Sequence, residues 1–289
     1  MGYGDDLLVT ALAANLKKKF PNRQIVIGNF AKKQAYHSII YDNNPNISDC
    51  RDLDKNKEIH IVDYHPENRP YINYEKSSNT KYTWNNKYKA SPGELYFTTN
   101  EIKVAKSIID DAKLFWKKNN TKKFNGIIFL ETSSTKIDHK NWSLKQINKD
   151  WGKDNWLALV QELKNSYLII HSNHNKTLDI NEIYKTENMS FRIACATMKL
   201  CDIYVGPEGG FSHVAGALDK KAVVYYGGWI DPKIIGYEFH TNIYYEHRFS
   251  PCGLYREVCA HCEEARNNIT VDYEFTSSDD LFFMKMAGN

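Results

Sequence analysis

One stretch of the chain constrains the fold most, because it joins an apolar run to a glycine-rich turn and then to a helix start. The apolar run is Ile203–Val205, the turn covers Gly206–Gly210, and Val214–Leu218 continue the helix. Backbone amides at a helix start point outward, and the helix dipole favours negative charge there. Two glycines, Gly209 and Gly210, also let a ligand approach the backbone closely. The stretch therefore predicts a buried strand, a turn and a helix arranged to hold a ligand.

Three polar side chains crowd this turn: a carboxylate (Glu208), a hydroxyl (Ser212) and an imidazole (His213). These groups suit a phosphorylated or hydroxyl-rich ligand. The alternative is an ordinary strand-to-helix turn in which Ser212 only caps the helix, since such turns are frequent in α/β folds.

Apolar runs and segments of helical spacing alternate along most of the chain. The predicted strands are 24–28, 58–62, 126–130, 167–170, 203–205 and 222–226, and the predicted helices are 8–20, 101–119, 156–163, 190–200 and 213–218. Continuous apolar strands separated by helices are typical of parallel sheets covered on both faces. We therefore predict an α/β protein with two doubly wound, Rossmann-like domains that face each other across a cleft. Ligands of such folds bind outside the carboxyl ends of the strands.

The polar segment 117–123 is the predicted linker, so the first domain covers 1–120 and the second covers 121–289. In the first helix, Leu8, Leu12, Leu16 and Phe20 repeat every four residues and predict one buried stripe. The chain begins on this helix, so we expect the first strand of the first domain to be missing. Segment 68–97, rich in Tyr, Asn, Lys and Pro, is predicted to form loops with short strands.

Composition excludes several classes of protein. The 289 residues suffice for two domains, and 42% hydrophobic residues is a globular value. No apolar run reaches the ~18 residues of a membrane span, and the N-terminus has no secretion-signal pattern. A net charge of +3 and the absence of an aromatic–basic motif do not favour nucleic-acid binding. We expect a cytoplasmic protein.

The chain contains six cysteines, which we expect to be mostly reduced thiols. Three of them, Cys252, Cys259 and Cys262, resemble a zinc-ligand cluster, with His247 or His261 as a fourth ligand. The cluster is a candidate site for a structural zinc or iron, although its irregular spacing and single CxxC pair favour the alternative, free thiols that fill a C-terminal loop.

Two charged residues lie at predicted helix starts. Asp5 is a candidate general base that takes a proton from an acceptor hydroxyl, or else a helix cap. Lys149 precedes the helix at Trp156 and is a candidate clamp for a diphosphate, or else a solvated lysine. Two turns at strand ends, 131–134 and 227–232, are weaker candidates, and Trp229 in the second could line the cleft.

Together these motifs resemble the family 9 glycosyltransferases, typified by ADP-heptose:lipopolysaccharide heptosyltransferases. The resemblance extends over nearly the whole chain and is carried by four segments in order: Gly4-Asp5-x-Leu7-Leu8-x-Thr10, Lys149-Asp150-Trp151, Met189-Ser190, and Val205 through Ala215. The late Cys-Gly…Cys-x-His-Cys segment also resembles a bacterial branch of this family.

The resemblance implies a GT-B fold and metal-independent transfer of a sugar from a nucleotide-diphosphate sugar. Carried over by residue, Asp5 is the base, Lys149 contacts the diphosphate, and Met189 flanks the nucleobase. Gly209, Gly210 and His213 contact the donor. Glu208 and Gly209 stand where heptosyltransferases usually have Asp and Thr, which leaves heptose open as the sugar.

The leading hypothesis is a bacterial glycosyltransferase that moves a heptose or another hexose-like sugar in lipopolysaccharide or surface-polysaccharide synthesis. Its acceptor would be a glycan or a lipid-linked glycan at the inner membrane, which the basic edge Lys17-Lys18-Lys19 could touch. One alternative is a non-catalytic nucleotide-sugar-binding or assembly protein with a metal-stapled C-terminal loop. Another is a glycosyltransferase whose acceptor is a protein.

Overall fold

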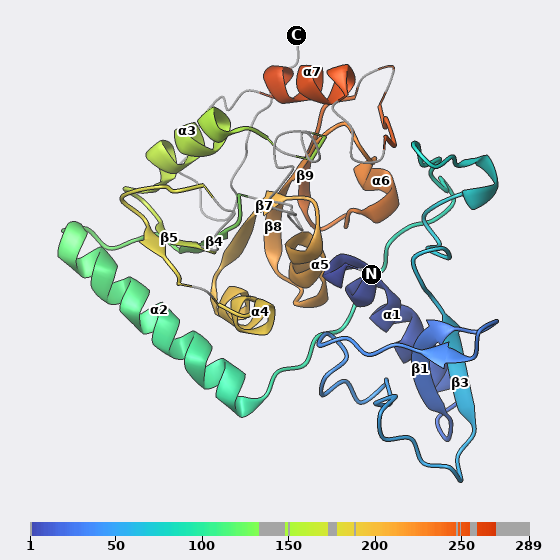
Figure 1. The fold of residues 1–289 in the computed structure, drawn as a ribbon. Coiled ribbons are helices and arrows are strands. Elements are labelled where there is room, and N and C mark those ends of the chain that lie inside the picture. The colour runs from blue at the N-terminus through green and yellow to red at the C-terminus, as the bar shows by residue number, and fades with distance from the viewer. Residues whose placement is uncertain are drawn as a thin grey trace.

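The fold contains two sheets, and one helix, α1 (Tyr3–Lys19), lies between them (Figure 1). The computed structural model describes residues 2–132, 148–149, 151–172, 178–187, 189–246, 248, 250–254 and 259–269. Within these residues, one sheet has three strands in the order β2-β1-β3, and the other has six in the order β6-β5-β4-β7-β8-β9.

The first sheet is smaller than a doubly wound domain. β1 (Gln24–Asn29) pairs in parallel with β3 (Ile59–Asp63) and antiparallel with the two-residue β2 (Gln34–Ala35). The residues after β3 add the 3₁₀ turn η1 (Tyr74–Lys76) and the bridge between Ile72 and Trp84 rather than further strand–helix units. This agrees with the loops predicted for segment 68–97, whose composition offers no long apolar run.

Helix α1 (Tyr3–Lys19) lies between the first sheet and the second, with its first turn against α5 (Figure 1). The prediction of a single stripe repeating every four residues is wrong, because Leu12 is 46% exposed whereas Leu7, Val9 and Ala13 are fully buried. A helix that packs on β1 on one side and on α5 on another buries a broader face than one stripe.

The six-stranded sheet is wholly parallel and forms the larger part of the fold. Its strands are β4 (Ile127–Leu130), β5 (Leu168–His171), β6 (Tyr184–Lys185), β7 (Ile203–Pro207), β8 (Lys221–Tyr226) and β9 (Thr241–Tyr244). The helices that follow β4 along the chain are α3 (Lys153–Leu163), α4 (Phe191–Leu200), α5 (Gly210–Ala217), α6 (Pro232–Ile235) and α7 (Ala260–Asn268). Counted from β4, the strand order is 3-2-1-4-5-6, the doubly wound order of a dinucleotide-binding sheet. The order reverses between β4 and β7, so the carboxyl ends of these two strands flank the expected ligand crevice.

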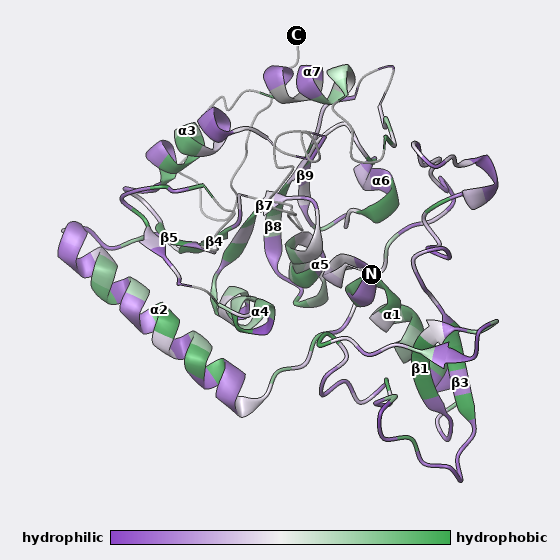
Figure 2. Ribbon diagram, in the orientation of Figure 1, coloured by the Kyte–Doolittle hydropathy of each residue, from purple (hydrophilic) through white to green (hydrophobic). Residues whose placement is uncertain are grey.

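Both faces of this sheet are buried, as the continuous apolar strands predict. Ile127 and Phe129 belong to the hydrophobic core that includes residues of α4 and α5, whereas Ile128 and Leu130 pack with Trp156 and other residues of α3. Figure 2 shows hydrophobic residues along β1, β3 and β7, and alternating hydrophobic and hydrophilic residues along α2.

Helix α2 (Thr99–Asn119) packs against α4 and reaches β5 and β6 (Figure 1). The predicted division places this helix in the first domain, but the helix packs against elements of the second sheet's part of the chain. Its buried residues are Ala105, Ile109, Ala112 and Trp116. The division at residue 120 stays a prediction. Among the described residues, no helix combines the length and apolarity needed to cross a membrane.

Candidate active site

The glycine-rich turn follows β7 at the switch point, and its geometry depends on Gly209. This residue adopts φ 154° and ψ −155°, a region essentially confined to glycine. The hydroxyl of Ser212 accepts from the Gly209 amide at 3.1 Å and donates to the Gly209 carbonyl at 2.8 Å. Ser212 therefore closes the first turn of α5, the capping role that was the alternative to ligand contact. The other first-turn amides of a helix have no partner within the helix and remain available for a ligand.

The starts of α1 and α5 lie directly against each other. A Cβ built on Gly4 would lie 2.9 Å from Cδ2 of His213 and 3.5 Å from Cα of Gly210. Only glycine at position 4 therefore allows this approach without a shift. Since each helix start carries partial positive charge, the junction of the two favours a bound anion.

Asp5 lies at this junction and is held by the loop-rich segment of the first sheet. The Tyr71 hydroxyl donates to its Oδ1 at 2.6 Å, and Nε of Arg69 lies 3.5 Å from its Oδ2. Burial and the Asp5 charge raise the pKa of Tyr71 well above its ordinary value, so the phenol stays a donor. The Gly2 amide also approaches Oδ2 at 3.4 Å, so Asp5 combines a weak capping contact with a fixed position in the site.

His213 faces the same junction from α5. Its Nδ1 lies 2.9 Å from the Tyr237 hydroxyl, and burial lowers the pKa of His213 to about 4. Smaller influences on this pKa come from the charges of Asp5, which raises it, and Lys149, which lowers it. The structure thus brings Asp5, Lys149 and His213 around one site, with the imidazole neutral at physiological pH.

Lys149 is ordered by two partners rather than solvated. Its Nζ lies 2.5 Å from Oε1 of Glu208 and 3.9 Å from the centre of the Trp229 ring. Glu208 is buried at the end of β7, so the lysine is directed towards the start of α5. The predicted donor contact of Glu208 is, in this structure, a contact with Lys149.

An aromatic wall links Lys149 to Asp5, and sequence reasoning missed most of it. Trp229 packs edge-on against Trp84 at 4.9 Å between ring centres, and Nε1 of Trp84 donates to the Trp229 carbonyl at 3.1 Å. Trp84 in turn stacks with Tyr71 at 6.3 Å. The available signal was the density of tyrosine and tryptophan in segment 68–97, which is unusual for a loop. The wall makes one side of the site apolar, as ligand pockets usually are.

Two other predicted contacts, Met189 and the turn 131–134, stay predictions. Met189 precedes α4, where the Thr197 hydroxyl lies 3.9 Å from its sulfur, and its described contacts are with the hydrophobic core. Thr132 follows β4 and lies 3.2 Å from Nε2 of His171, whereas Ser133 and Ser134 lie outside the described residues.

The three late cysteines form a buried cluster behind the Trp229 turn. The sulfurs of Cys252, Cys259 and Cys262 lie within 4.8 Å of one another, and those of Cys252 and Cys262 are 3.3 Å apart. A tetrahedral ion with metal–sulfur bonds of about 2.3 Å holds its sulfurs about 3.8 Å apart, so these three fit such an ion. The hydrogen bond between Cys252 and Cys262 lowers the pKa of Cys252 and raises that of Cys262, so the pair favours one thiolate beside one thiol when no metal is bound. A metal needs thiolates, so its binding would release the remaining proton. His247 and the side chain of His261 lie outside the described residues.

The cysteine loop is bonded to the site itself. The Cys252 amide donates to the Gly228 carbonyl at 2.7 Å, and the Gly253 amide donates to the Trp229 carbonyl at 3.1 Å. Nδ2 of Asn148, beside Lys149, donates to the Leu254 carbonyl at 3.1 Å. The cluster therefore supports the backbone that positions Trp229 and Lys149.

Comparisons with known proteins identify the fold. No protein-family model matches the sequence, and neither does any curated protein. Among solved structures, the glycosyltransferase family 9 protein of Veillonella parvula is 12% identical, with 84% of this chain and 82% of that chain covered and a TM-score of 0.50. The iron-containing dodecameric glycosyltransferase TibC of enterotoxigenic E. coli is also 12% identical, with 87% and 62% covered and a TM-score of 0.50. The ADP-heptose lipopolysaccharide heptosyltransferase II of E. coli is 14% identical at a TM-score of 0.36, with 53% and 46% covered. The chain thus spans 46% of the E. coli heptosyltransferase and 62% of TibC.

Proposed function

We propose that this chain, which has the GT-B-like fold of the family 9 glycosyltransferases, transfers a sugar from a nucleotide-diphosphate sugar to an acceptor hydroxyl. One observation carries the proposal: Asp5, Lys149 and His213 surround the junction of two helix starts at the switch point of a doubly wound sheet. A candidate base, a cation and an array of amides in one place are the groups that such a transfer needs.

In the proposed reaction the acceptor oxygen attacks the anomeric carbon of the sugar, and the bond from that carbon to the diphosphate oxygen breaks. The acceptor proton passes to the Asp5 carboxylate, and the bonding electrons leave with the nucleotide diphosphate. The growing charge on the diphosphate is stabilised by the first-turn amides of α5 and by Lys149. Tyr71 and Arg69 hold Asp5 on the other side of the site.

His213 serves this reaction as a neutral hydrogen-bonding group. When the Tyr237 hydroxyl donates to Nδ1, the ring proton is on Nε2 and can be donated to a donor phosphate or sugar oxygen. Burial raises the pKa of Tyr237, which keeps its hydroxyl protonated for this role. The pair thus directs one N–H hydrogen-bond donor, Nε2 of His213, into the site without adding charge.

The donor sugar is a heptose or another hexose-like sugar, and the acceptor is a glycan or lipid-linked glycan in lipopolysaccharide or surface-polysaccharide synthesis. Two structural neighbours are described in complex with ADP-heptose or a fluorinated analogue, which supports a nucleotide-diphosphate sugar as donor. We place the protein in the cytoplasm, with peripheral contact to the inner membrane through Lys18 and Lys19, which are exposed at the end of α1. Loss of sedimentation with phosphatidylglycerol vesicles in Lys18→Gln/Lys19→Gln supports this contact, and unchanged sedimentation contradicts it.

A zinc or iron ion held by Cys252, Cys259 and Cys262 would act as a structural staple. TibC, a neighbour in fold, is described as iron-containing. The ion would fix the loop that bonds to Gly228 and Trp229, so its role is to support the donor site while the transfer itself uses Asp5 and Lys149. Metal analysis of the purified protein tests the staple, and a metal-free protein with reactive thiols contradicts it.

A non-catalytic nucleotide-sugar-binding protein is the second candidate, and one observation favours it. Glu208 already neutralises Lys149, which would weaken the stabilisation of a departing diphosphate. A binder and an enzyme differ in whether a bound donor is ever broken.

The test combines binding with turnover. Titration calorimetry with ADP, GDP, UDP and CDP identifies the nucleotide, and incubation with the matching sugar nucleotides, including ADP-heptose, reveals slow release of the diphosphate to water. The proposal expects one nucleotide to bind and its sugar derivative to be hydrolysed, with hydrolysis lost and binding retained in Asp5→Asn. Binding without release from any donor favours the second candidate, and no binding at all refutes both.

A further inference from the structure

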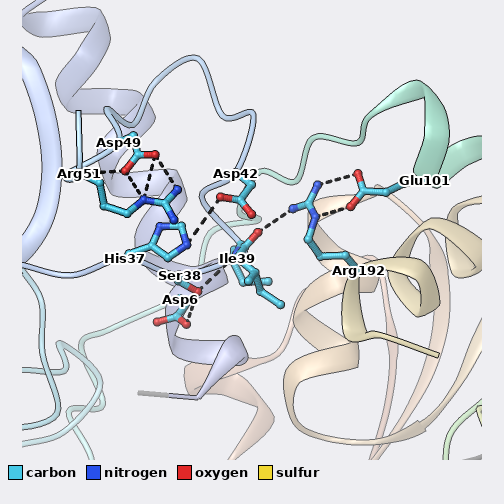
Figure 3. Close-up of polar contacts among 10 residues, drawn as sticks. Asp6, His37, Ser38, Ile39, Asp42, Asp49, Arg51, Glu101 and Arg192 are labelled. Atoms are coloured by element: carbon cyan, nitrogen blue, oxygen red, sulfur yellow. Dashed lines mark hydrogen bonds and ion pairs between the residues drawn. The ribbon is translucent and has the colours of Figure 1, made fainter. Parts of the chain in front are cut away.

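A buried arginine outside the site joins several segments of the fold. Arg192 lies in the first turn of α4 and is 7% exposed. Its guanidinium donates to both oxygens of Glu101, from Nε at 2.5 Å and from Nη2 at 3.0 Å. It also donates from Nη1 to the Ile39 carbonyl at 2.7 Å (Figure 3). Its Nη2 donates to the Tyr96 carbonyl at 2.6 Å. The partners belong to α2, to the loop between β2 and β3, and to the segment before α2.

These contacts require the planar fork of a guanidinium group. One cation reaches a carboxylate with two parallel bonds and two separate carbonyls at the same time, which the compact ammonium of lysine cannot do. Glu101 is also fixed independently, because its Oε2 accepts from the amide and the hydroxyl of Thr98 at the start of α2. Arg192 therefore holds the Ile39 carbonyl in a fixed position relative to α2 and α4.

The Ile39 contact leads to the helix that carries Asp5. Ser38, the preceding residue, donates through its hydroxyl to Oδ2 of Asp6 at 2.7 Å (Figure 3). The Tyr41 hydroxyl donates to Oδ1 of Asp6 at 3.3 Å. Asp6 is buried at the start of α1 and adjoins Asp5 in sequence. The loop from Ser38 to Tyr41 thus connects Arg192 to the start of α1.

The residue before Arg192 touches the starts of both helices of the site. The Phe191 ring lies 4.9 Å from the Phe211 ring in the first turn of α5 and 4.4 Å from the Tyr3 ring in the first turn of α1. The start of α4 therefore contacts α1 and α5 directly and also holds α1 through the loop.

We propose that Arg192 is a positioning residue that fixes the Asp5 carboxylate relative to the first turn of α5, where the donor diphosphate binds. The inference rests on the proposed function, since Asp5 is its base. It assigns Arg192 an effect on the transfer step rather than on donor affinity, because the groups that hold the diphosphate do not touch Arg192. A displacement of about 1 Å between reacting groups lowers a rate about 100-fold.

Four variants separate positioning from simple support of the fold. Arg192→Gln removes the cation, Arg192→Lys keeps the charge without the fork, and Ser38→Ala breaks only the bond to Asp6. Arg51→Gln is the matched control, because Arg51 lies in the same loop but is exposed and pairs with the nearby Asp49 (Figure 3). The readouts are hydrogen exchange at the amides of residues 6–10, the dissociation constant of ADP, and the rate of ADP release from ADP-heptose.

We expect exchange at residues 6–10 to rise at least 10-fold in Arg192→Gln and Ser38→Ala and to stay unchanged in Arg51→Gln. ADP release should fall about 10- to 100-fold in Arg192→Gln, with a smaller fall in Arg192→Lys, while the dissociation constant of ADP changes less than 2-fold. Unchanged exchange in folded Arg192→Gln overturns the inference, and so does an ADP affinity that falls in parallel with the rate.

Two outcomes keep this test apart from that of the proposed function. If Arg192→Gln does not fold, Ser38→Ala decides the inference by the same exchange measurement. If the wild-type protein binds no nucleotide, the proposed function fails, and the exchange at residues 6–10 still decides whether Arg192 holds α1.

Discussion

Replacing Lys149 with Gln removes a cation from a buried carboxylate and from the proposed diphosphate site at once. Glu208 has 3% of its side chain exposed and Lys149 has 23%, with 2.5 Å between the charged atoms. Breaking a buried ion pair by removing one partner costs about 3–5 kcal/mol. Because water reaches part of Lys149, we expect about 2–3 kcal/mol, which corresponds to a fall in melting temperature of about 3–5 °C for a chain of this length.

The double variant Lys149→Gln/Glu208→Gln separates the two roles of this lysine. It leaves no charge unpaired, so most of the lost stability should return. ADP binding should not return, because the variant still lacks the ammonium group that donates to the diphosphate. Loss of a hydrogen bond between charged groups is worth about 1.5–3 kcal/mol, or about a 10- to 150-fold weaker affinity.

Differential scanning fluorimetry measures the stability and titration calorimetry measures the affinity for ADP in all three proteins. A single variant with the wild-type melting temperature would show that the ion pair is not buried as described. A double variant that binds ADP as tightly as the wild type would refute the assignment of Lys149 to the diphosphate.

Three further predictions concern Asp5, Gly209 and two buried histidines. Asp5→Asn should lower diphosphate release about 100- to 10,000-fold with an unchanged dissociation constant for ADP, and a loss of less than 5-fold counts against the base assignment. Gly209→Ala should lower the free energy of unfolding in urea by about 1–3 kcal/mol, because φ 154° and ψ −155° suit only glycine. Gly210→Ala is the control, since a Cβ at that position would meet its nearest atom at 3.6 Å. Equal losses of stability in the two variants contradict the reasoning. Burial lowers the pKa values of His213 and His240 to about 4, so the unfolded chain binds more protons between pH 6.5 and pH 4. The free energy of unfolding should therefore decrease by about 1.4 kcal/mol per histidine for each unit by which the pH is lowered from 6.5 to 4. A His213→Asn/His240→Asn variant that loses as much stability as the wild type over this range contradicts this origin.

The larger sheet could be predicted from the sequence because its elements are local patterns. Runs such as Ile127–Leu130 and Leu168–His171 are short, apolar and rich in β-branched residues, and each is fully buried in the structure. Their alternation with helices also predicts the parallel order and therefore the edge of the sheet where ligands bind. The turn at Gly209 was found for the same reason, since its signal is contiguous.

The remainder of the site depends on contacts between distant segments, which no local pattern contains. Tyr71 is 66 residues from Asp5 and Trp84 is 145 residues from Trp229, yet both pairs are hydrogen-bonded. Arg192 likewise binds Ile39 across 153 residues. Polar and aromatic side chains in loops gain such partners only when the fold brings the loops together, so their roles were visible only in the structure.

The exposed Leu12 shows the opposite limit, in which a clear pattern misled. Four leucine and phenylalanine positions spaced by four residues favour one stripe, but an interval of four drifts around a helix of 3.6 residues per turn. Leu7, Val9 and Ala13 are buried instead, because α1 is covered by β1 and by α5.

The most direct measurement is a crystal structure of the protein with ADP bound. We predict that the diphosphate lies at the junction of α1 and α5, with its oxygens within about 3.1 Å of the first-turn amides of α5 and of Nζ of Lys149, and with the Asp5 carboxylate facing it. A diphosphate bound anywhere else, or one that leaves Lys149 paired only with Glu208, would contradict the proposed site.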